Sequence, residues 1–370
     1  MLKRFGLARR WMSFVTLFLL VAGLTTACDF GGQPPEGSKL PITGEVSLTG
    51  LGASFPAPLY QNWAVGLNRV HSNIRVDYQS QGSGAGIENF IQGNVDFAAS
   101  DIAIKDEDIP KVQRGVLMLP MTAGSIVVAY NLPGVPEGLK LSRDVYVGIF
   151  SGQIRRWNDP KIVALNPGVT LPDQGITVVH RSDGSGTTAV FTKHLSAISP
   201  AWQKTFGEGT TIQWPKTGSF VGARGNEGVT AQIQQTPGAI GYVEFGFARN
   251  NKLTTAALQN KAGEYVIPTP ESGAATLAAV ALPENLRAFI SDPEGKDSYP
   301  IVTYTWQLQY QKQPDANKAV GLEVWVEYGL NEGQKAAPEL GYIPLPKVVR
   351  ERIAKAADTM SDKYTITLKD

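Results

Sequence analysis

The sequence predicts an α/β protein of about two domains, on three observations. A chain of 370 residues is long enough for about two domains with a sizeable core. Its 42% hydrophobic and 18% charged residues are typical of a globular chain rather than a disordered one. Strand, small-residue turn and helix follow one another three times, within residues 45–70, 73–92 and 176–195.

The N-terminus is predicted to be a targeting segment. Four basic residues precede an apolar stretch, residues 11–27, which is shorter than the roughly 20 residues that span a bilayer. It ends at Cys28, the only cysteine, in a pattern that resembles a bacterial lipobox, although Thr25 stands where an aliphatic residue is usual. We expect a signal peptide over 1–27, lipidation of Cys28 and a flexible tether over 28–44. An ordinary cleaved signal and an uncleaved anchor are the alternatives.

The composition argues against nucleic-acid binding and against sites built from cysteines. The formal net charge is +1 and no long charge run is present, which argues against a nucleic-acid partner. A single cysteine excludes an intramolecular disulfide and a cysteine-based zinc site.

The first two turns follow short strands predicted at 45–50 and 73–79. Ser54 and Phe55 lie at the mouth of the first helix, where they could contribute to a site or serve only as helix cap and core. The second turn, S-Q-G-S-G-A-G (80–86), precedes a helix predicted at 87–92 and matches neither a Walker loop nor a dinucleotide fingerprint.

An acidic residue ends the next predicted strand, residues 95–100. Asp101 would lie on the side of an open α/β sheet where ligands bind, although a helix cap or surface acid is the commoner outcome. Strands predicted at 116–120 and 125–130 flank residues 121–124, which are short enough to be a linker between lobes.

The third turn, residues 181–186, is the richest in hydrogen-bond donors. It joins a strand at 176–179 to a helix at 187–195, so its backbone N–H groups and the positive end of the helix dipole suit an anion. Arg181 adds a planar cation, and Ser185 and Thr187 add hydroxyl groups. The alternative is an ordinary turn in which Ser185 caps the helix.

The remaining elements are predicted in less detail. Residues 161–172 are expected to be a loop and 248–258 to be exposed. The β-rich residues 299–310 could carry the chain back toward the first lobe. Helices are predicted at 226–235, 317–331 and 348–359, and the one at 317–331 is amphipathic.

Binding suits this set of groups better than catalysis. No H-E-x-x-H or G-x-S-x-G motif is present, so a hydrolase with Ser185 as nucleophile is the weaker alternative. An ionised Asp101 can only accept hydrogen bonds, whereas the other groups of the predicted site donate them. Asp101 would therefore suit an oxyanion that keeps a proton. Phosphate and arsenate keep one near neutral pH, whereas sulfate would leave the carboxylate unpaired.

Five stretches together resemble the periplasmic phosphate-binding proteins of bacterial high-affinity phosphate ABC transporters, which are type II periplasmic binding proteins. The similarity runs from about residue 45 to about residue 310 and is weaker beyond. The stretches are L-T-G-L-G-A-S-F-P-A-P-L-Y (48–60), Y-Q-S-Q-G-S-G-A-G (78–86), V-D-F-A-A-S-D (95–101), R-S-D-G-S-G-T-T (181–188) and P-G-A-I-G-Y-V-E (237–244).

The resemblance implies a role for each matching residue. Asp101 corresponds to the aspartate that accepts the phosphate proton, and Asp183 to an acid that orients the arginine. Gly84 stands where the family commonly has a second serine, so any backup hydroxyl is absent. The phosphate-binding residues implied are Ser54, Phe55, Ser83, Asp101, Arg181, Ser185, Gly186 and Thr187.

The resemblance also implies fold and function. It predicts two α/β lobes, each a mixed sheet flanked by helices, with the ligand in the interlobe cleft; residues 45–122 plus 302–370 would form the first lobe and 123–301 the second. It implies a monomeric extracytoplasmic receptor, without catalytic activity, cofactor or metal, that delivers inorganic phosphate to the membrane permease subunits of an ABC importer. A phosphate-ester hydrolase, or a surface adhesion or signalling protein, on the same scaffold remains the alternative.

Overall fold

The structure, a computed structural model, describes residues 40–369. The expected signal peptide, Cys28 and the tether as far as residue 39 therefore lie outside the described residues. Within them, a nine-stranded sheet has the strand order β2-β1-β3-β12-β4-β8-β6-β7, with β9 paired to β4. Its strands are β1 Val46–Gly52, β2 Ile74–Ser80, β3 Phe97–Ser100, β4 Leu117–Tyr130, β6 Thr177–Arg181, β7 Ser219–Ala223, β8 Ala239–Glu244, β9 Thr254–Thr255 and β12 Val302–Gln309.

The predicted strands at 45–50, 73–79 and 95–100 form a parallel group near one end of this sheet. β1 pairs with β2 and β3, and Gly52 lies opposite both Ser80 and Ala99. Because the three strands end at the same level, the turns that follow them meet at one edge of the sheet, as the carboxyl ends of parallel strands do. The helices after β1 and β2 are α1 Ala57–Val70 and α2 Ser83–Gln92.

Residues 121–124 do not form the flexible linker predicted from sequence, because they lie inside the long strand β4, on which the chain passes from one part of the sheet to the other. Ala123 pairs with Tyr304 of β12, and the next part of β4 pairs with β8, where Ile126 lies opposite Glu244. Met121, Thr122 and Ala123 are fully buried, so small size here reflects close packing rather than flexibility. We call β2, β1, β3 and β12 the first half of the sheet, and β8, β6 and β7 the second half.

The second half repeats the strand–turn–helix pattern. β6 lies between β7 and β8 and is parallel to both, and the helices that follow β6 and β7 are α5 Gly186–Ile198 and α7 Gly225–Gln235. The expected loop at 161–172 instead begins within α4 Pro160–Leu165, started by Pro160 and capped by Asp159. The expected exposure of 248–258 holds for residues 250–252 but not for Ala248, Ala256 and Leu258, which are fully buried.

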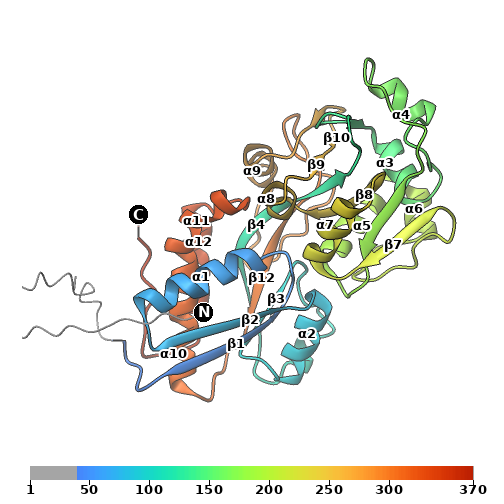
Figure 1. Cartoon of the computed structure of the whole chain (residues 1–370). Helices are drawn as coiled ribbons and strands as arrows, with labels where there is room; N and C mark the ends of the chain where they lie inside the picture. Colours follow the sequence, from blue (N-terminus) through green and yellow to red (C-terminus); the bar gives the residue numbers. More distant parts are fainter. Residues whose placement is uncertain (1–39, 370) are drawn as a thin grey trace, which may run out of the picture. The chain divides into compact units, whose positions relative to one another are not determined.

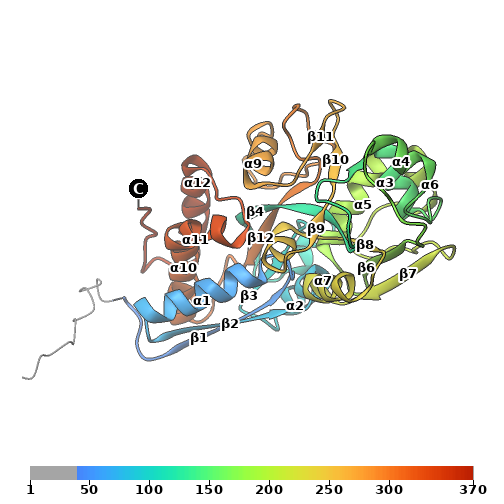
Figure 2. The same cartoon turned by 45° about the horizontal axis from the view of Figure 1, so that its top comes forward.

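The C-terminal helices pack against the beginning of the described chain, as the red and blue ribbons show (Figures 1 and 2). Trp325 of α10 lies against Tyr60 and Trp63 of α1, with ring centroids 5.9 and 5.8 Å apart. The other elements are β5 Lys140–Leu141, β10 Ala257–Gln259, β11 Tyr265–Val266, η1 Ile109–Lys111, α3 Arg143–Phe150, α6 Pro200–Thr205, α8 Phe245–Asn250, α9 Pro270–Ala278, α10 Ala316–Leu330, α11 Glu332–Leu340 and α12 Lys347–Ala357.

Candidate functional site

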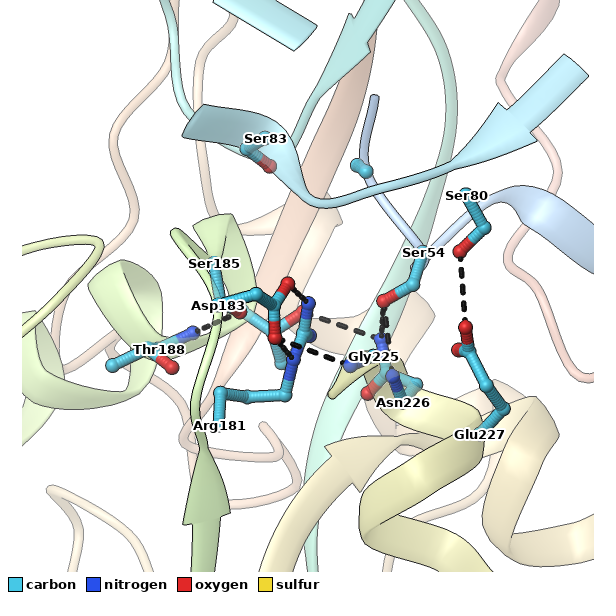
Figure 3. A network of polar contacts seen from close by, with 12 residues as sticks. Ser54, Ser80, Ser83, Arg181, Asp183, Ser185, Thr188, Gly225, Asn226 and Glu227 are labelled. Carbon is cyan, nitrogen blue, oxygen red and sulfur yellow. Dashed lines mark hydrogen bonds and ion pairs between the residues drawn. The ribbon is translucent and has the colours of Figure 1, made fainter. Parts of the chain in front are cut away.

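The residues singled out from the sequence come together where the turns of the two halves meet. Asp101 follows β3 of the first half. Ser54 after β1 and Ser83 at the start of α2 also come from the first half, and the turn between β6 and α5 comes from the second (Figure 3). All of the predicted binding residues are buried: Ser54, Phe55, Ser83, Asp101, Arg181, Ser185, Gly186 and Thr187.

Asp101 is held by hydroxyl groups from both halves. Its Oδ1 accepts a hydrogen bond from Thr305 Oγ1 of β12 at 2.9 Å, and its Oδ2 accepts one from Thr187 Oγ1 of α5 at 3.1 Å. Its backbone N–H donates to Ser83 Oγ at 3.2 Å. Each carboxylate oxygen keeps further acceptor capacity, so the group can still receive a proton-bearing ligand oxygen.

Arg181 is oriented by the acid that follows it on the same turn. Its Nε donates to Asp183 Oδ1 at 2.7 Å, and its Nη2 pairs with Asp183 Oδ2, a two-pronged contact that fixes the plane of the guanidinium (Figure 3). Asp183 Oδ1 also accepts from the backbone N–H of Gly225 at 3.1 Å, which ties it to the start of α7. Nη1 of Arg181 lies 3.5 Å from Thr187 Oγ1, in the first turn of α5.

Ser54 is positioned by a residue that the sequence analysis did not single out. Its Oγ accepts from the backbone N–H of Asn226 at 3.0 Å and from Asn226 Nδ2 at 2.9 Å (Figure 3). Because both contacts use the oxygen as acceptor, the hydroxyl hydrogen of Ser54 remains available to a ligand. Asn226 Nδ2 also lies 3.4 Å from Thr187 Oγ1, so one amide connects hydroxyls of the two halves.

The N-termini of α2 and α5 approach each other closely, which requires a glycine at position 186. Gly84 N donates to Gly184 O at 2.9 Å across the contact. A Cβ on Gly186 would overlap Ser83 Oγ and lie 2.8 Å from Asp101 Cβ, so no side chain fits there. Two helix N-termini that meet head to head concentrate free N–H groups and positive dipole ends on one small volume.

Burial and charge set the ionisation of the two acids in opposite directions. Burial raises the pKa of Asp101 to about 6, with Thr305 and Arg181 acting against the rise. Burial also acts to raise the pKa of Asp183, but its hydrogen bond and charge contact with Arg181 outweigh this and lower it. Near neutral pH the site therefore holds a compensated Arg181–Asp183 pair and a separate, weakly acidic carboxyl.

The structural roles that the sequence analysis gave as alternatives, helix cap for Ser185 and core residue for Phe55, are both present. Ser185 does cap α5, since its Oγ accepts from the N–H of Thr188 at 3.0 Å (Figure 3). Phe55 is fully buried against Tyr342, whose hydroxyl donates to the Phe55 carbonyl at 2.7 Å. Neither role prevents the Ser185 hydroxyl hydrogen from facing a ligand, because the cap uses only the oxygen as acceptor.

Comparison with known proteins identifies the family. A family model described as a PBP superfamily domain matches residues 38–332. A phosphate-binding protein PstS of Pasteurella multocida is 42% identical over 312 residues, which cover 83% of this chain and 88% of that protein. That of Haemophilus influenzae is 41% identical over 335 residues, covering 89% of this chain and 96% of the relative. The chain belongs to the PstS family of phosphate-binding proteins.

The fold agrees with solved members of the PBP superfamily. The structure of a high-affinity periplasmic phosphate-binding protein, PfluDING, solved with bound phosphate, is similar with a TM-score of 0.70 at 22% identity, covering 84% of this chain and 93% of that one. The expected type II periplasmic-binding-protein fold and the resemblance drawn from the five sequence stretches are thus confirmed.

Two residues of this PstS family chain belong to the site but were missed from sequence. Asn226 begins α7 directly after Gly225, so it follows the same strand–turn–helix pattern that marked the other turns and could have been found that way. Thr305 lies in the middle of the β-rich segment 299–310, and no local pattern distinguishes its hydroxyl from those of neighbouring threonines. Only the pairing of β12 with β3, Trp306 opposite Ser100, brings it to Asp101.

Among residues 40–369, no helix is long and apolar enough to cross a membrane. The same residues contain no group of three or more histidine, cysteine, aspartate or glutamate side chains arranged to hold a metal ion.

Proposed function

We propose that this chain is an extracytoplasmic receptor that captures inorganic phosphate and delivers it to the permease of an ABC importer. The relatives named phosphate-binding protein PstS support the substrate, and they support a receptor rather than an enzyme. The solved neighbour described as a putative phosphate ABC transporter substrate-binding protein supports the importer.

The observation that carries the proposal is the single acceptor among many donors. Ser54, Ser83, Arg181, Ser185 and Thr187 offer hydroxyl, guanidinium and helix N-terminal N–H groups, which suit a tetrahedral oxyanion. Asp101 suits the one oxygen that still carries a proton. A fully deprotonated anion would bring no proton to this carboxylate, and its oxygen would instead face a buried negative charge. Sites that pair a buried polar group with a ligand proton reject ligands lacking that proton by about 10⁴-fold.

Calorimetric titration with phosphate and sulfate at pH 8 tests the proposal. We expect phosphate to bind and sulfate to bind far more weakly. Asp101→Asn, which retains the shape of the side chain, should weaken discrimination against sulfate more than it weakens phosphate binding. Equal binding of both anions by the unchanged protein would contradict the role given to Asp101, and competition with arsenate identifies which protonated oxyanion is preferred.

We further propose that residues 45–122 plus 302–370 and residues 123–301 act as two lobes that close on the ligand. Contacts between groups on the two sides, such as Ser54 with Asn226, support a closed arrangement. A ligand that touches both sides stabilises the closed state, because it gains contacts only there. Small-angle scattering should show a smaller radius of gyration with phosphate than without it.

The membrane anchor and the monomeric state belong to the same proposal. Cys28 ends the apolar N-terminal stretch, which supports lipidation at that residue. Incorporation of labelled palmitate in a bacterial host, lost in Cys28→Ser, is the expected result; equal labelling of both chains would contradict it. Sedimentation velocity should give a single monomeric species with and without phosphate.

A further inference from the structure

A cavity of about 470 Å³ lies directly against the proposed phosphate site. Asp101 and Thr303 line it from the first half of the sheet, and Val190 and Thr210 line it from the second. Ser54, Ser83, Ser185 and Thr187 are at most 1% exposed. The cavity is therefore open space that borders Asp101, a residue otherwise enclosed by the two halves.

The irregular segment 286–292 forms one wall of this cavity. It contacts elements of the first half of the sheet at its beginning and helices of the second half at its end. On one side, Trp306 Nε1 of β12 donates to Leu286 O at 2.8 Å, and Arg287 Nη2 donates to Ile104 O at 2.9 Å. Arg287 also pairs with Asp106, with Nη1 and Oδ1 2.5 Å apart. These contacts fix the beginning of the segment to elements of the first half.

The other end of the segment is fixed to helices that pack with the second half. Asp292 pairs with Arg143 of α3, and the Lys193 ammonium of α5 lies 4.8 Å from the centre of the Phe289 ring. Phe289 is 53% exposed, so this contact is at the outer surface of the cavity. The segment thus bridges the two sides by contacts that do not involve the proposed ligand.

The backbone of the segment is strained at both ends. Three non-glycine residues with positive φ occur among residues 40–369, and two of them are Leu286, at 59°, and Asp292, at 49°. Such a conformation is unfavourable for a residue with a Cβ, more so for leucine than for aspartate, and it persists only where surrounding contacts impose it. Loss of a contact at one end would therefore favour release of the segment.

We propose that segment 286–292 is a latch that closes the passage between solvent and Asp101, and that the Arg287 contacts with Asp106 and Ile104 set the residence time of the bound anion. This inference rests on the proposed phosphate binding. Because the latch joins both sides without touching the ligand, it stabilises the closed state whether or not phosphate is bound. Weakening it should speed dissociation of phosphate.

Two substitutions test the latch from opposite sides of the same ion pair. Arg287→Gln removes the cation, and Asp106→Asn removes its partner at a side chain that is 84% exposed, where the fold is not at risk. Asp106→Asn should raise the dissociation rate of phosphate about twofold to threefold, as for an ion pair with one exposed partner. Arg287→Gln, which also loses the bond to the Ile104 carbonyl, should raise it about fivefold to tenfold. The measurement is release of radiolabelled phosphate into an excess of unlabelled phosphate.

Lys261→Gln is the matched control. It removes the exposed ion pair between Lys261 and Glu294, two residues beyond the segment, and should leave the dissociation rate unchanged. If the unchanged protein binds no phosphate, the proposed function fails. If it binds phosphate but Arg287→Gln and Asp106→Asn release it at the unchanged rate, the latch is overturned while the proposed function stands.

A blocking experiment tests the passage itself. Thr211 lines the cavity and is exposed, so a cysteine placed there in a Cys28→Ser chain can be labelled with a bulky maleimide. Labelling should slow phosphate association at least about tenfold if the route is obstructed. Labelling of Lys363→Cys, on the exposed C-terminal segment, should not. Equal association rates for both labelled chains would refute a passage through this cavity.

Discussion

Acidification should make this protein bind sulfate. Burial raises the pKa of Asp101 to about 6, so the carboxyl becomes protonated as the pH falls below that value. A protonated Asp101 has an O–H group to donate, and it then suits the sulfate oxygen that an ionised carboxylate excludes. Phosphate carries a proton of its own throughout this range, so its binding does not depend on protonation of Asp101 in the same way.

The expected size of the effect follows from the titration. With a pKa of about 6, about 1% of Asp101 is protonated at pH 8 and about 90% at pH 5. If sulfate binds only the protonated form, its affinity rises about 90-fold from pH 8 to pH 5, which corresponds to about 2.7 kcal/mol of binding free energy. The change in affinity approaches tenfold per pH unit at the alkaline end of this range. The direction is fixed by the raised pKa: affinity for sulfate is present below pH 6 and is lost above it.

Calorimetric sulfate titrations from pH 5 to pH 8 measure the effect, and three variants locate it. Asp101→Asn should bind sulfate equally at all these pH values. Thr305→Val removes the hydroxyl that donates to Asp101 Oδ1 and should move the midpoint upward by about one pH unit. Thr303→Val is the control, because that hydroxyl contacts the Asp101 and Tyr304 carbonyls instead. A sulfate affinity that does not vary with pH in the unchanged protein would refute the reasoning.

Three substitutions test other parts of the site. Gly186→Ala should weaken phosphate binding about 10- to 100-fold in calorimetry because its Cβ would overlap Ser83 in the closed arrangement; Gly184→Ala, whose Cβ would meet only ordinary contacts from 3.4 Å, should bind almost normally. Arg181→Ala leaves the partly buried carboxylate of Asp183 unpaired and should lower the free energy of urea unfolding by about 3 kcal/mol at pH 7. The loss should be smaller below pH 4, where Asp183 of the variant becomes protonated. Asn226→Ala, which loses the amide contact with the first-turn serine, should weaken phosphate binding about tenfold, and unchanged affinity would remove it from the site.

The elements that could be predicted from sequence are those with a strong local period. The strands before the three turns and the helices after them lie within a few residues of the positions expected, because alternation and helical spacing are local properties. The long strand β4 could not be recognised, because residues 121–124 contain a threonine, an alanine and a glycine that are equally typical of a loop. Its pairing with β12, from residues 302–309, and then with β8, from residues 239–244, supplies the order that the local sequence lacks.

The turns of the candidate site could also be predicted because their patterns are local, but the contacts between the turns could not. Gly-rich turns at helix N-termini are visible in sequence, and the family resemblance gave each turn a residue and a role. What the sequence could not give is how the groups contact one another. The donation from Asn226 to Ser54 depends on the two halves meeting, and the donation from Thr305 to Asp101 depends on a strand that returns about 200 residues later. Separations of that length leave no local pattern.

The correction at β4 changes how closure should be viewed. The chain crosses between the halves on β4 and returns on β12, and these two strands are paired along residues 117–125, with an irregularity between Thr305 and Trp306. A flexible linker would let the halves move independently of the ligand, whereas a paired ribbon bends as a unit. The irregular step carries both Thr305, bonded to Asp101, and Trp306, bonded to segment 286–292. Bending at this step would therefore move the carboxyl that we propose recognises the phosphate proton and the proposed latch together, so that recognition and closure would be coupled through one pair of strands.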